Sequence, residues 1–183
     1  ATFSPRANVR YNPTHDINLR LSYAEGFRAP QAFDEDLHIS NVGGDRVSIV
    51  RSPDLKEERS RSVNGSVDWY HFFGDFQLNL LFEGFYTKLS DPFVLSAPVE
   101  ADNGSLVQTR TNGSGAKVYG GTLEGKIAYR NKAQLQAGIT VQRSLYDNPE
   151  EWSADKAHLT DAERNSDKIL RTPNLYGYFT ASY

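Results

Sequence analysis

Short stretches in which apolar and polar residues alternate recur along the whole chain. Residues 17–24 show the alternation most clearly, because Ile17, Leu19, Leu21 and Tyr23 are separated by polar or small residues. A period of two over this length is typical of a β-strand whose two faces meet different surroundings. Comparable segments lie at 3–11, 55–70, 76–85, 115–129, 133–146 and 171–183. The pattern therefore predicts an all-β fold with about seven strands.

The connections between these segments alternate strictly in length. Short turns are predicted at 12–16, 71–75 and 130–132, and long loops at 26–54, 90–112 and 147–172. Tight turns between consecutive strands predict one antiparallel meander with neighbours in chain order. Short turns on one rim and long loops on the other are typical of a transmembrane β-barrel with its loops outside the cell and its turns in the periplasm. A soluble sandwich would distribute its loop lengths over both ends.

Three smaller elements are predicted inside the long loops. Pro30 is well placed as the first residue of a short helix that runs through Phe33 to Leu37. Apolar pairs on either side of residues 102–104 indicate a small hairpin that projects beyond the sheet. The charged third loop is expected to hold a short helix near residues 154–164.

Composition narrows the class of protein. Hydrophobic residues make up 38% of the 183 residues, and no run of eighteen apolar residues occurs, so no transmembrane helix is predicted. A formal charge of −3 without a basic tract argues against nucleic-acid binding. Cysteine is absent, which excludes disulfides and thiolate chemistry. The chain begins at Ala1 and contains no methionine, so we expect a piece of a longer protein.

Four stretches resemble TonB-dependent outer-membrane receptors. Residues 23–30, YAEGFRAP, match the family's YAxGFRAP signature. Residues 55–69 resemble its LKPExSxxxExG strand, with Glu57 in place of the usual proline and Asp68 near the position of a glutamate. Residues 115–125 resemble an AxxxGxE strand, and Thr172-Pro173 precedes the last strand as in many of these receptors. The resemblance implies that residues 1–183 form part of a 22-stranded barrel domain, without the plug domain and the remaining strands.

The resemblance also implies a function. Such a receptor lies in the bacterial outer membrane and takes up a scarce nutrient, with a ferric siderophore or cobalamin first and oligosaccharides also possible. Its energy comes from TonB through an N-terminal part outside this chain, and its further partners are its own plug domain and membrane lipid. No enzymatic activity, cofactor or nucleic-acid partner is implied. The two open edges of an excised sheet are expected to favour self-association.

Candidate site residues fall into two groups. The arginines of the first two strands lie on polar faces, where they either pair with acids across a wet lumen or meet the plug. Asp34–Asp36 with His38 indicates either the solvated start of a helix or a ligand contact in the outer vestibule. Ligand contacts are predicted at Phe27, Arg28, Asp34, Glu35, Asp36 and Trp152, and Arg28 is also the best candidate for a plug contact. Residues that face the plug are predicted at Arg6, Arg10, Arg20, Glu83 and Glu124.

The apolar faces suggest contact with lipid. Eight residues are predicted to share the outward side: Leu19, Leu21, Val67, Leu78, Leu80, Leu135, Ile139 and Phe179. Aromatic residues near strand ends are by default interpreted as an interfacial girdle. These are Tyr23, Phe27, Tyr70, Phe85, Tyr146 and Tyr176.

The sequence gives little support for metal binding or for hydrolytic catalysis. The four histidines are isolated from one another, so no metal site is predicted. Serine, aspartate and histidine are present, but the nucleophile elbow GxSxG of one class of hydrolases is not. The alternative to a transport receptor is a soluble, secreted β-sandwich that binds carbohydrate through exposed aromatic side chains.

Overall fold

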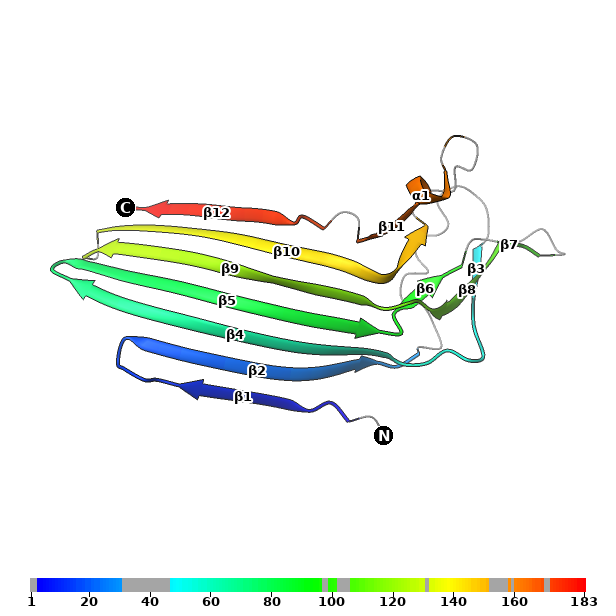
Figure 1. Ribbon diagram of the computed structural model, residues 1–183, viewed down its shortest axis with the longest axis horizontal. Coiled ribbons are helices and arrows are strands. Elements are labelled where there is room, and N and C mark those ends of the chain that lie inside the picture. The colour runs from blue at the N-terminus through cyan, green and yellow to red at the C-terminus, as the bar shows by residue number, and fades with distance from the viewer. Residues whose placement is uncertain are drawn as a thin grey trace.

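The computed structural model describes residues 3–30, 47–96, 99–101, 106–130, 132–151, 158, 160–169 and 172–183. One large sheet of eight strands dominates it (Figure 1). Its long strands are β1 (Arg6–Tyr11), β2 (Ile17–Arg28), β4 (Glu58–Phe73), β5 (Phe76–Ser90), β9 (Ala116–Tyr129), β10 (Ala133–Glu151) and β12 (Leu175–Ser182). The short strand β11 (Asn165–Lys168) completes the sheet.

The strand order confirms the predicted meander. Neighbours run β1-β2-β4-β5-β9-β10, and every pair in this sheet is antiparallel. The edge of β10 that does not face β9 pairs with two strands, β12 along residues 134–141 and β11 along residues 145–151. The seven alternating segments of the sequence therefore correspond to the seven long strands. β11 adds a short extension at the loop end.

The strands are longer than the sequence pattern indicates. β4 runs on to Phe73 and pairs it with Phe76, so the turn at 71–75 shrinks to Gly74-Asp75. Gly74 has a φ of 57°, the left-handed conformation that two-residue hairpin turns need and that glycine adopts without strain. β5 and β10 likewise extend past 85 and 146. Cross-strand pairing therefore continues where the alternation weakens.

A second, smaller sheet lies at the loop end of the first (Figure 1). It contains β3 (Val47–Arg51), β6 (Phe93–Leu95), β7 (Val99–Glu100) and β8 (Leu106–Asn112). β6 and β7 pair with β8 in antiparallel fashion, as predicted for the segments on either side of 102–104, and residues 102–104 themselves lie outside the described residues. β3 and β8 pair in parallel, and the sequence pattern had not predicted this pair. Two long loops are thus joined by backbone hydrogen bonds.

A single helical turn, α1 (Asp161–Arg164), lies inside the predicted range of 154–164. Thr160 donates to the Glu163 carboxylate from its backbone N–H at 2.9 Å and from its hydroxyl at 2.7 Å. These bonds form the capping arrangement of a helix start and hold the pKa of Glu163 below its ordinary value. Beyond Pro30, the helix predicted from Pro30 to Leu37 lies outside the described residues. Among the described residues, no helix is long and apolar enough to cross a membrane.

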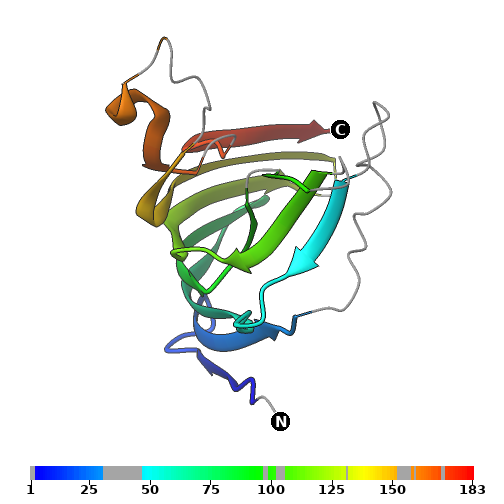
Figure 2. The same cartoon turned by 90° about the vertical axis from the view of Figure 1, so that its right-hand side faces the viewer.

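The large sheet curves into a trough, with β1 and β12 at its two rims (Figure 2). The exposed fractions of the side chains show which face is concave. Side chains converge on a concave surface and are buried there, whereas they diverge on a convex surface and stay exposed. Polar Asn18, Asp68, Thr140 and Ser144 on one face are at most 8% exposed. Apolar residues on the other face are 42 to 57% exposed, namely Val67, Phe82, Leu123 and Ile139. The trough is therefore polar inside and apolar outside.

The pairing register confirms that the eight residues predicted to point outward share one face. Val9 pairs with Leu21, Leu19 with Val67, and Val67 with Phe82. The same face continues through further directly opposed pairs to the last strand, namely Leu78–Ile127, Ile127–Leu135, Leu123–Ile139 and Ala137–Phe179. Within the described residues no second sheet covers this face. The described residues therefore do not form a two-layer sandwich.

Candidate functional site

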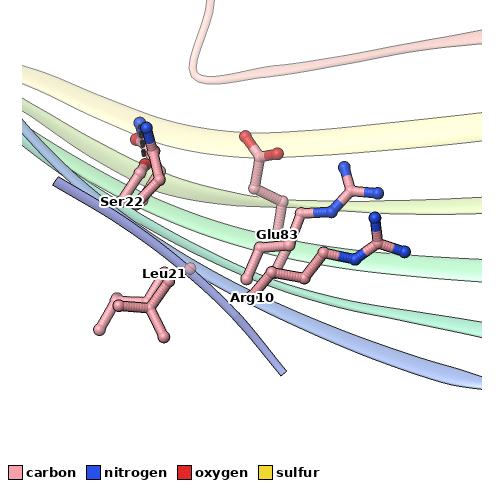
Figure 3. A pocket seen from close by; sticks show the side chains of 10 residues that line it. Arg10, Leu21, Ser22 and Glu83 are labelled. Carbon is pink, nitrogen blue, oxygen red and sulfur yellow. Dashed lines mark hydrogen bonds between the residues drawn. The ribbon is translucent and has the colours of Figure 1, made fainter. Parts of the chain in front are cut away.

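The inner surface of the trough carries a hollow of about 390 Å³ near its β1 rim. One lateral row of the sheet lines it, because Arg10 lies opposite Arg20, Arg20 opposite Ser66, and Ser66 opposite Glu83. Arg10, Ser22 and Glu83 project into the trough, whereas Leu21 points to the outer side (Figure 3). Within the described residues the Glu83 side chain makes no hydrogen bond or ion pair. The Arg10 guanidinium bonds to the amide side chains of Asn12 and Asn18, and both it and the Arg20 guanidinium keep further N–H donors for a partner inside the trough.

A polar network lies next to this hollow, one row closer to the short turns. The Asp68 carboxylate accepts hydrogen bonds from Tyr70 Oη at 2.9 Å and from Asn79 Nδ2 at 2.5 Å. The Asn18 amide oxygen, in the orientation that satisfies its neighbours, accepts from Arg10 Nη2 at 2.6 Å and Nε at 2.9 Å. Buried Asn18 and Asp68 are therefore satisfied by side chains of the same face.

A second network joins strands that are not neighbours. Tyr178 on β12 donates its hydroxyl proton to Glu124 on β9. Gln136 Nε2 donates to the same carboxylate at 2.8 Å and to the Tyr178 oxygen at 2.9 Å. The Tyr178 ring crosses β10 above Gly138, where an added Cβ would lie 2.5 Å from Tyr178 Cε1. The absence of a side chain at Gly138 is what lets β12 reach β9.

The register places all five predicted plug-facing residues on the inner surface of the trough. Arg10, Arg20 and Glu83 lie together at the hollow, and Glu124 lies in the second network. Arg6 lies opposite Ala24, on the same face as Arg10. Arg6 and Glu124 are on different strands and do not share one cluster with the other three. The sequence thus predicted that these residues share the inner face. Which of them lie close together depends on the pairing register of the strands.

Arg28 lies at the loop end of the inner surface, opposite Glu58. Its guanidinium lies over the Phe93 ring, 5.4 Å from the centroid, and Glu58 accepts the Phe93 backbone N–H at 3.1 Å. Both residues thus hold the small sheet against the wall of the trough. Phe27 is on the outer face, because consecutive residues of a strand point to opposite faces and Arg28 points inward. Asp34, Glu35, Asp36 and Trp152 lie outside the described residues.

Asn112 fastens the two long loops to each other. Its side-chain oxygen accepts from the Lys56 backbone N–H at 2.8 Å, and its Nδ2 donates to the carbonyls of Lys56 at 3.1 Å and Asp91 at 2.7 Å. One amide therefore bonds to three backbone groups that no strand ladder satisfies. The small sheet is an anchored part of the loop end, and it positions Arg51 and Arg110 side by side.

The outer surface carries a belt of side chains, with aromatic side chains toward both ends of the strands and apolar side chains between them. Near the short turns, the rings of Trp69, His71, Phe73 and Phe76 stack in succession, and Phe76 meets Tyr129 in a tilted arrangement. Near the loops, Tyr86 and Tyr119 stack with centroids 6.4 Å apart. On β4 the belt runs from Phe73 to Val63, ten residue steps or roughly 33 Å of strand. At the strand tilt of about 40° found in barrels, this spans roughly 25 Å, the height of an outer-membrane apolar band.

The register corrects part of the predicted girdle. Tyr70, Phe85, Tyr146 and Tyr176 lie on the inner face, opposite residues such as Asn79, Asn64, Ala116 and Thr140. The girdle interpretation is therefore wrong for these four, because position near a strand end does not decide which face a side chain occupies. Tyr23 and Phe27 do lie on the outer face.

The described residues contain no group of three or more histidine and acidic side chains that could hold a metal ion. Inside the trough, the carboxylates of Asp68 and Glu124 instead accept hydrogen bonds from neighbouring side chains. These two carboxylates are therefore engaged in polar contacts within the sheet itself.

Comparison with known proteins agrees with this geometry. The whole chain, residues 1–183, matches the family model described as TonB dependent receptor-like, beta-barrel. The FrpB iron transporter from Neisseria meningitidis (F3-3 variant) is similar in structure, with a TM-score of 0.55, 19% identity, and coverage of 78% of this chain and 20% of that chain. The siderophore receptor PirA from Pseudomonas aeruginosa is also similar in structure, with a TM-score of 0.58 and 17% identity. The match covers 79% of this chain and 28% of that chain.

No curated protein sequence matches the chain. The chain spans 20% and 28% of the lengths of the two solved relatives. At identities below 25%, these two structures show a common fold. The family model and the two neighbours describe transport receptors rather than enzymes.

Proposed function

Since the chain belongs to the family of TonB-dependent receptor β-barrels, we propose that it forms one side of an outer-membrane barrel that imports a scarce nutrient. The observation that carries this proposal is the opposite chemistry of the two sheet faces. An apolar belt roughly 25 Å high suits the outer membrane, whereas a soluble protein would cover so large an apolar surface. The polar concave face suits a lumen that holds water and a plug domain. Residues 1–183 are on this account part of one barrel domain.

The polar trough supports contact with the receptor's own plug. Arg6, Arg10, Arg20, Glu83 and Glu124 are the proposed plug-facing residues. Charged groups gain most from a partner when that partner also excludes water from them. Arg10, Arg20 and Glu83 meet this condition best, because they share one hollow. TonB would supply energy through the N-terminal part of the receptor.

Replacing both Arg10 and Arg20 with glutamine is expected to loosen the plug in the full receptor. Loss of charged hydrogen bonds that become buried on docking costs about 1–3 kcal/mol each, so plug amides should exchange hydrogen at least fivefold faster. Hydrogen exchange read by mass spectrometry measures this. Arg130→Gln, at the turn rim, is the control. Unchanged plug exchange in the double variant would show that the hollow faces water alone.

Ligand contact is proposed for the long loops. Loops above a rigid wall can change without disturbing the strand ladder, and they carry both charge signs and aromatic side chains. Arg28, Asp34, Glu35, Asp36 and Trp152 are the proposed contacts, and contact by Phe27 stays a prediction. The two solved relatives are named an iron transporter and a siderophore receptor. A ferric siderophore is therefore the favoured cargo, ahead of cobalamin.

Deleting residues 147–172 from the full receptor, with a short linker in their place, is expected to abolish most uptake and to leave the barrel intact. The ladder between β10 and β12 needs only residues 134–141 and 175–182, which the deletion keeps. Growth on a ferric siderophore as the only iron source measures uptake, and the gel shift of unheated samples measures barrel folding. Normal growth of the folded deletion variant would place the ligand site elsewhere.

A further inference from the structure

The small sheet lies at the mouth of the trough. Its strands are beyond the loop ends of the long strands in Figure 1, and β3 and β8 run across the open, concave side in the view of Figure 2. Its strands come from two different long loops, because β3 precedes β4 whereas β6, β7 and β8 lie between β5 and β9. On the proposed function, cargo passes beside this sheet on its way into the lumen. How firmly the sheet is joined to the wall therefore matters for capture.

One side chain joins the small sheet to the ends of two wall strands. Asn112 is the last residue of β8, Lys56 lies two residues before β4, and Asp91 directly follows β5. The Asn112 amide accepts one hydrogen bond and donates two to the backbone of these residues, at 2.7 to 3.1 Å. Three partners in different directions fix the orientation of an amide group. The end of β8 is therefore held against both wall strands.

The backbone at this junction adopts a conformation that needs such support. Asp91 has a φ of 53°, which side chains other than glycine rarely adopt and which persists only where the surroundings fix it. Its carbonyl accepts Asn112 Nδ2 at 2.7 Å, and the next carbonyl, that of Pro92, accepts the Gly113 backbone N–H at 2.7 Å. The reversal of the chain after β5 is thus fastened by the residues that end β8.

A second pair of wall residues holds β6. Glu58 accepts the Phe93 backbone N–H at 3.1 Å, and the Arg28 guanidinium lies 5.4 Å from the centroid of the Phe93 ring. Arg28 and Glu58 are directly opposed on β2 and β4. We call Arg28, Glu58, Asp91, Phe93 and Asn112 the joint. It connects the small sheet to three strands of the wall, and β3 is tied in through its five-residue ladder with β8.

We propose that Asn112 is a positioning residue for cargo capture, because it holds the small sheet as a fixed part of the barrel mouth before any cargo binds. The proposal rests on the proposed function and deepens it, since it names the part of the loop end that is already ordered. A protein whose competent arrangement is only partly populated binds more weakly in proportion to that population. The joint keeps the population of the held sheet high, so the cargo does not have to order it.

The first test measures hydrogen exchange by mass spectrometry on the full receptor in lipid vesicles without cargo. Peptides that cover β3 and β8 should be protected in the unmodified receptor. Asn112→Ala removes three hydrogen bonds at roughly fivefold each, so these peptides should exchange about a hundredfold faster. Gln108→Ala is the matched control on the same strand. Gln108 Nε2 donates to the Ser96 carbonyl at 3.1 Å, within one loop, so its loss should leave the exchange of β3 unchanged.

The second test separates positioning from folding. Uptake of radioactive ferric iron in a tris-catecholate chelate is measured over a range of concentrations. Asn112→Ala should raise the half-saturating concentration about fivefold or more and leave the maximal rate unchanged, because the held sheet becomes a minor population. A defect in folding alone would lower the maximal rate and leave the half-saturating concentration as it is. Gln108→Ala should match the unmodified receptor in both values.

Two results would overturn the proposal. One is rapid exchange of β3 and β8 in the unmodified receptor without cargo, with protection only after cargo is added. The other is an unchanged half-saturating concentration in Asn112→Ala. If that variant fails to fold, Phe93→Leu decides, because it removes only the contact with Arg28 and should raise exchange about threefold. Unchanged exchange in Phe93→Leu would then refute the joint.

The outcome can be separated from that of the proposed function. A receptor that takes up no tris-catecholate chelate would refute this cargo, and the exchange measurement without cargo would then decide about the joint. A receptor that imports the chelate, yet exchanges β3 and β8 rapidly before cargo arrives, would refute the joint alone.

Discussion

Val67→Arg is expected to lower the free energy of unfolding of the receptor in lipid by about 2–4 kcal/mol. Val67 lies near the middle of the outer belt, opposite Leu19 on one side and Phe82 on the other. A guanidinium at this depth loses its hydration, and the flanking side chains offer it no hydrogen bond. Lipid-facing arginines at the midplane of barrels cost this amount. The loss is large against the total stability of an ordinary protein domain.

A residue of the inner face on the neighbouring strand provides the control for that prediction. Leu81 lies opposite Asp68 on one side and Glu124 on the other, where an arginine can stay hydrated or pair with a carboxylate. Leu81→Arg is expected to change the free energy of unfolding by less than about 1 kcal/mol. Urea unfolding in lipid vesicles measures both variants. Equal losses at Val67 and Leu81 would show that the two faces do not meet different surroundings.

Gly120→Ala is expected to destabilise the wall by about 1–3 kcal/mol, because the added methyl group has no space. A Cβ at Gly120 would lie 2.3 Å from the Val141 carbonyl oxygen and 2.8 Å from Gln142 Cα. These are backbone atoms of β10, so no side-chain rotation relieves the contact. β9 and β10 must move apart, which weakens ladder hydrogen bonds on both sides of Gly120.

Gly84→Ala is the matched control for this substitution. Gly84 lies in a strand of the same sheet, and a Cβ there would meet nothing within 4 Å. The change should be neutral, or stabilising by up to about 1 kcal/mol, because alanine restricts the unfolded chain. Vesicle-based urea unfolding again gives the measurement. A destabilised Gly84→Ala together with an unaffected Gly120→Ala would contradict the predicted close approach of β9 and β10.

The sequence pattern predicted the strands and their order because the signal is local. Ile17, Leu19, Leu21 and Tyr23 alternate strictly, and each short turn joins two strands into a hairpin, namely β1–β2, β4–β5 and β9–β10. The same alternation decides which face each side chain occupies, because every second residue of a strand points to the same side. This is why the eight residues predicted to point outward, from Leu19 to Phe179, share one face. The polar inner positions of Arg10 and Glu83 follow by the same argument.

The sequence pattern failed where partners are distant in the chain. β3 has five residues, and its partner β8 comes from the next long loop, about 60 residues later and in parallel. No local pattern indicates such a pair. Asn112 had no visible signal either, because its three contacts reach Lys56 and Asp91.

The sequence pattern also could not predict which residues of different strands lie side by side. Arg61, Lys88 and Lys117 lie opposite one another on β4, β5 and β9. Each is an ordinary surface cation when it is read in its own segment, and a register slip of one residue would send each to the other face. The approach of Tyr178 to Glu124 across Gly138 also depends on the register of three strands. Both features become visible only when the pairing is known.

One measurement tests most directly whether the convex face lies in lipid and the concave face in a wet lumen. This part of the receptor has no cysteine, so single cysteines can be placed at consecutive positions 121–127 of β9 and spin-labelled in vesicles. We predict a period of two, with oxygen accessibility highest at odd positions such as Leu123 and Ile127 and low at Thr122 and Glu124. Uniform accessibility, or maxima at the even positions, would contradict the account.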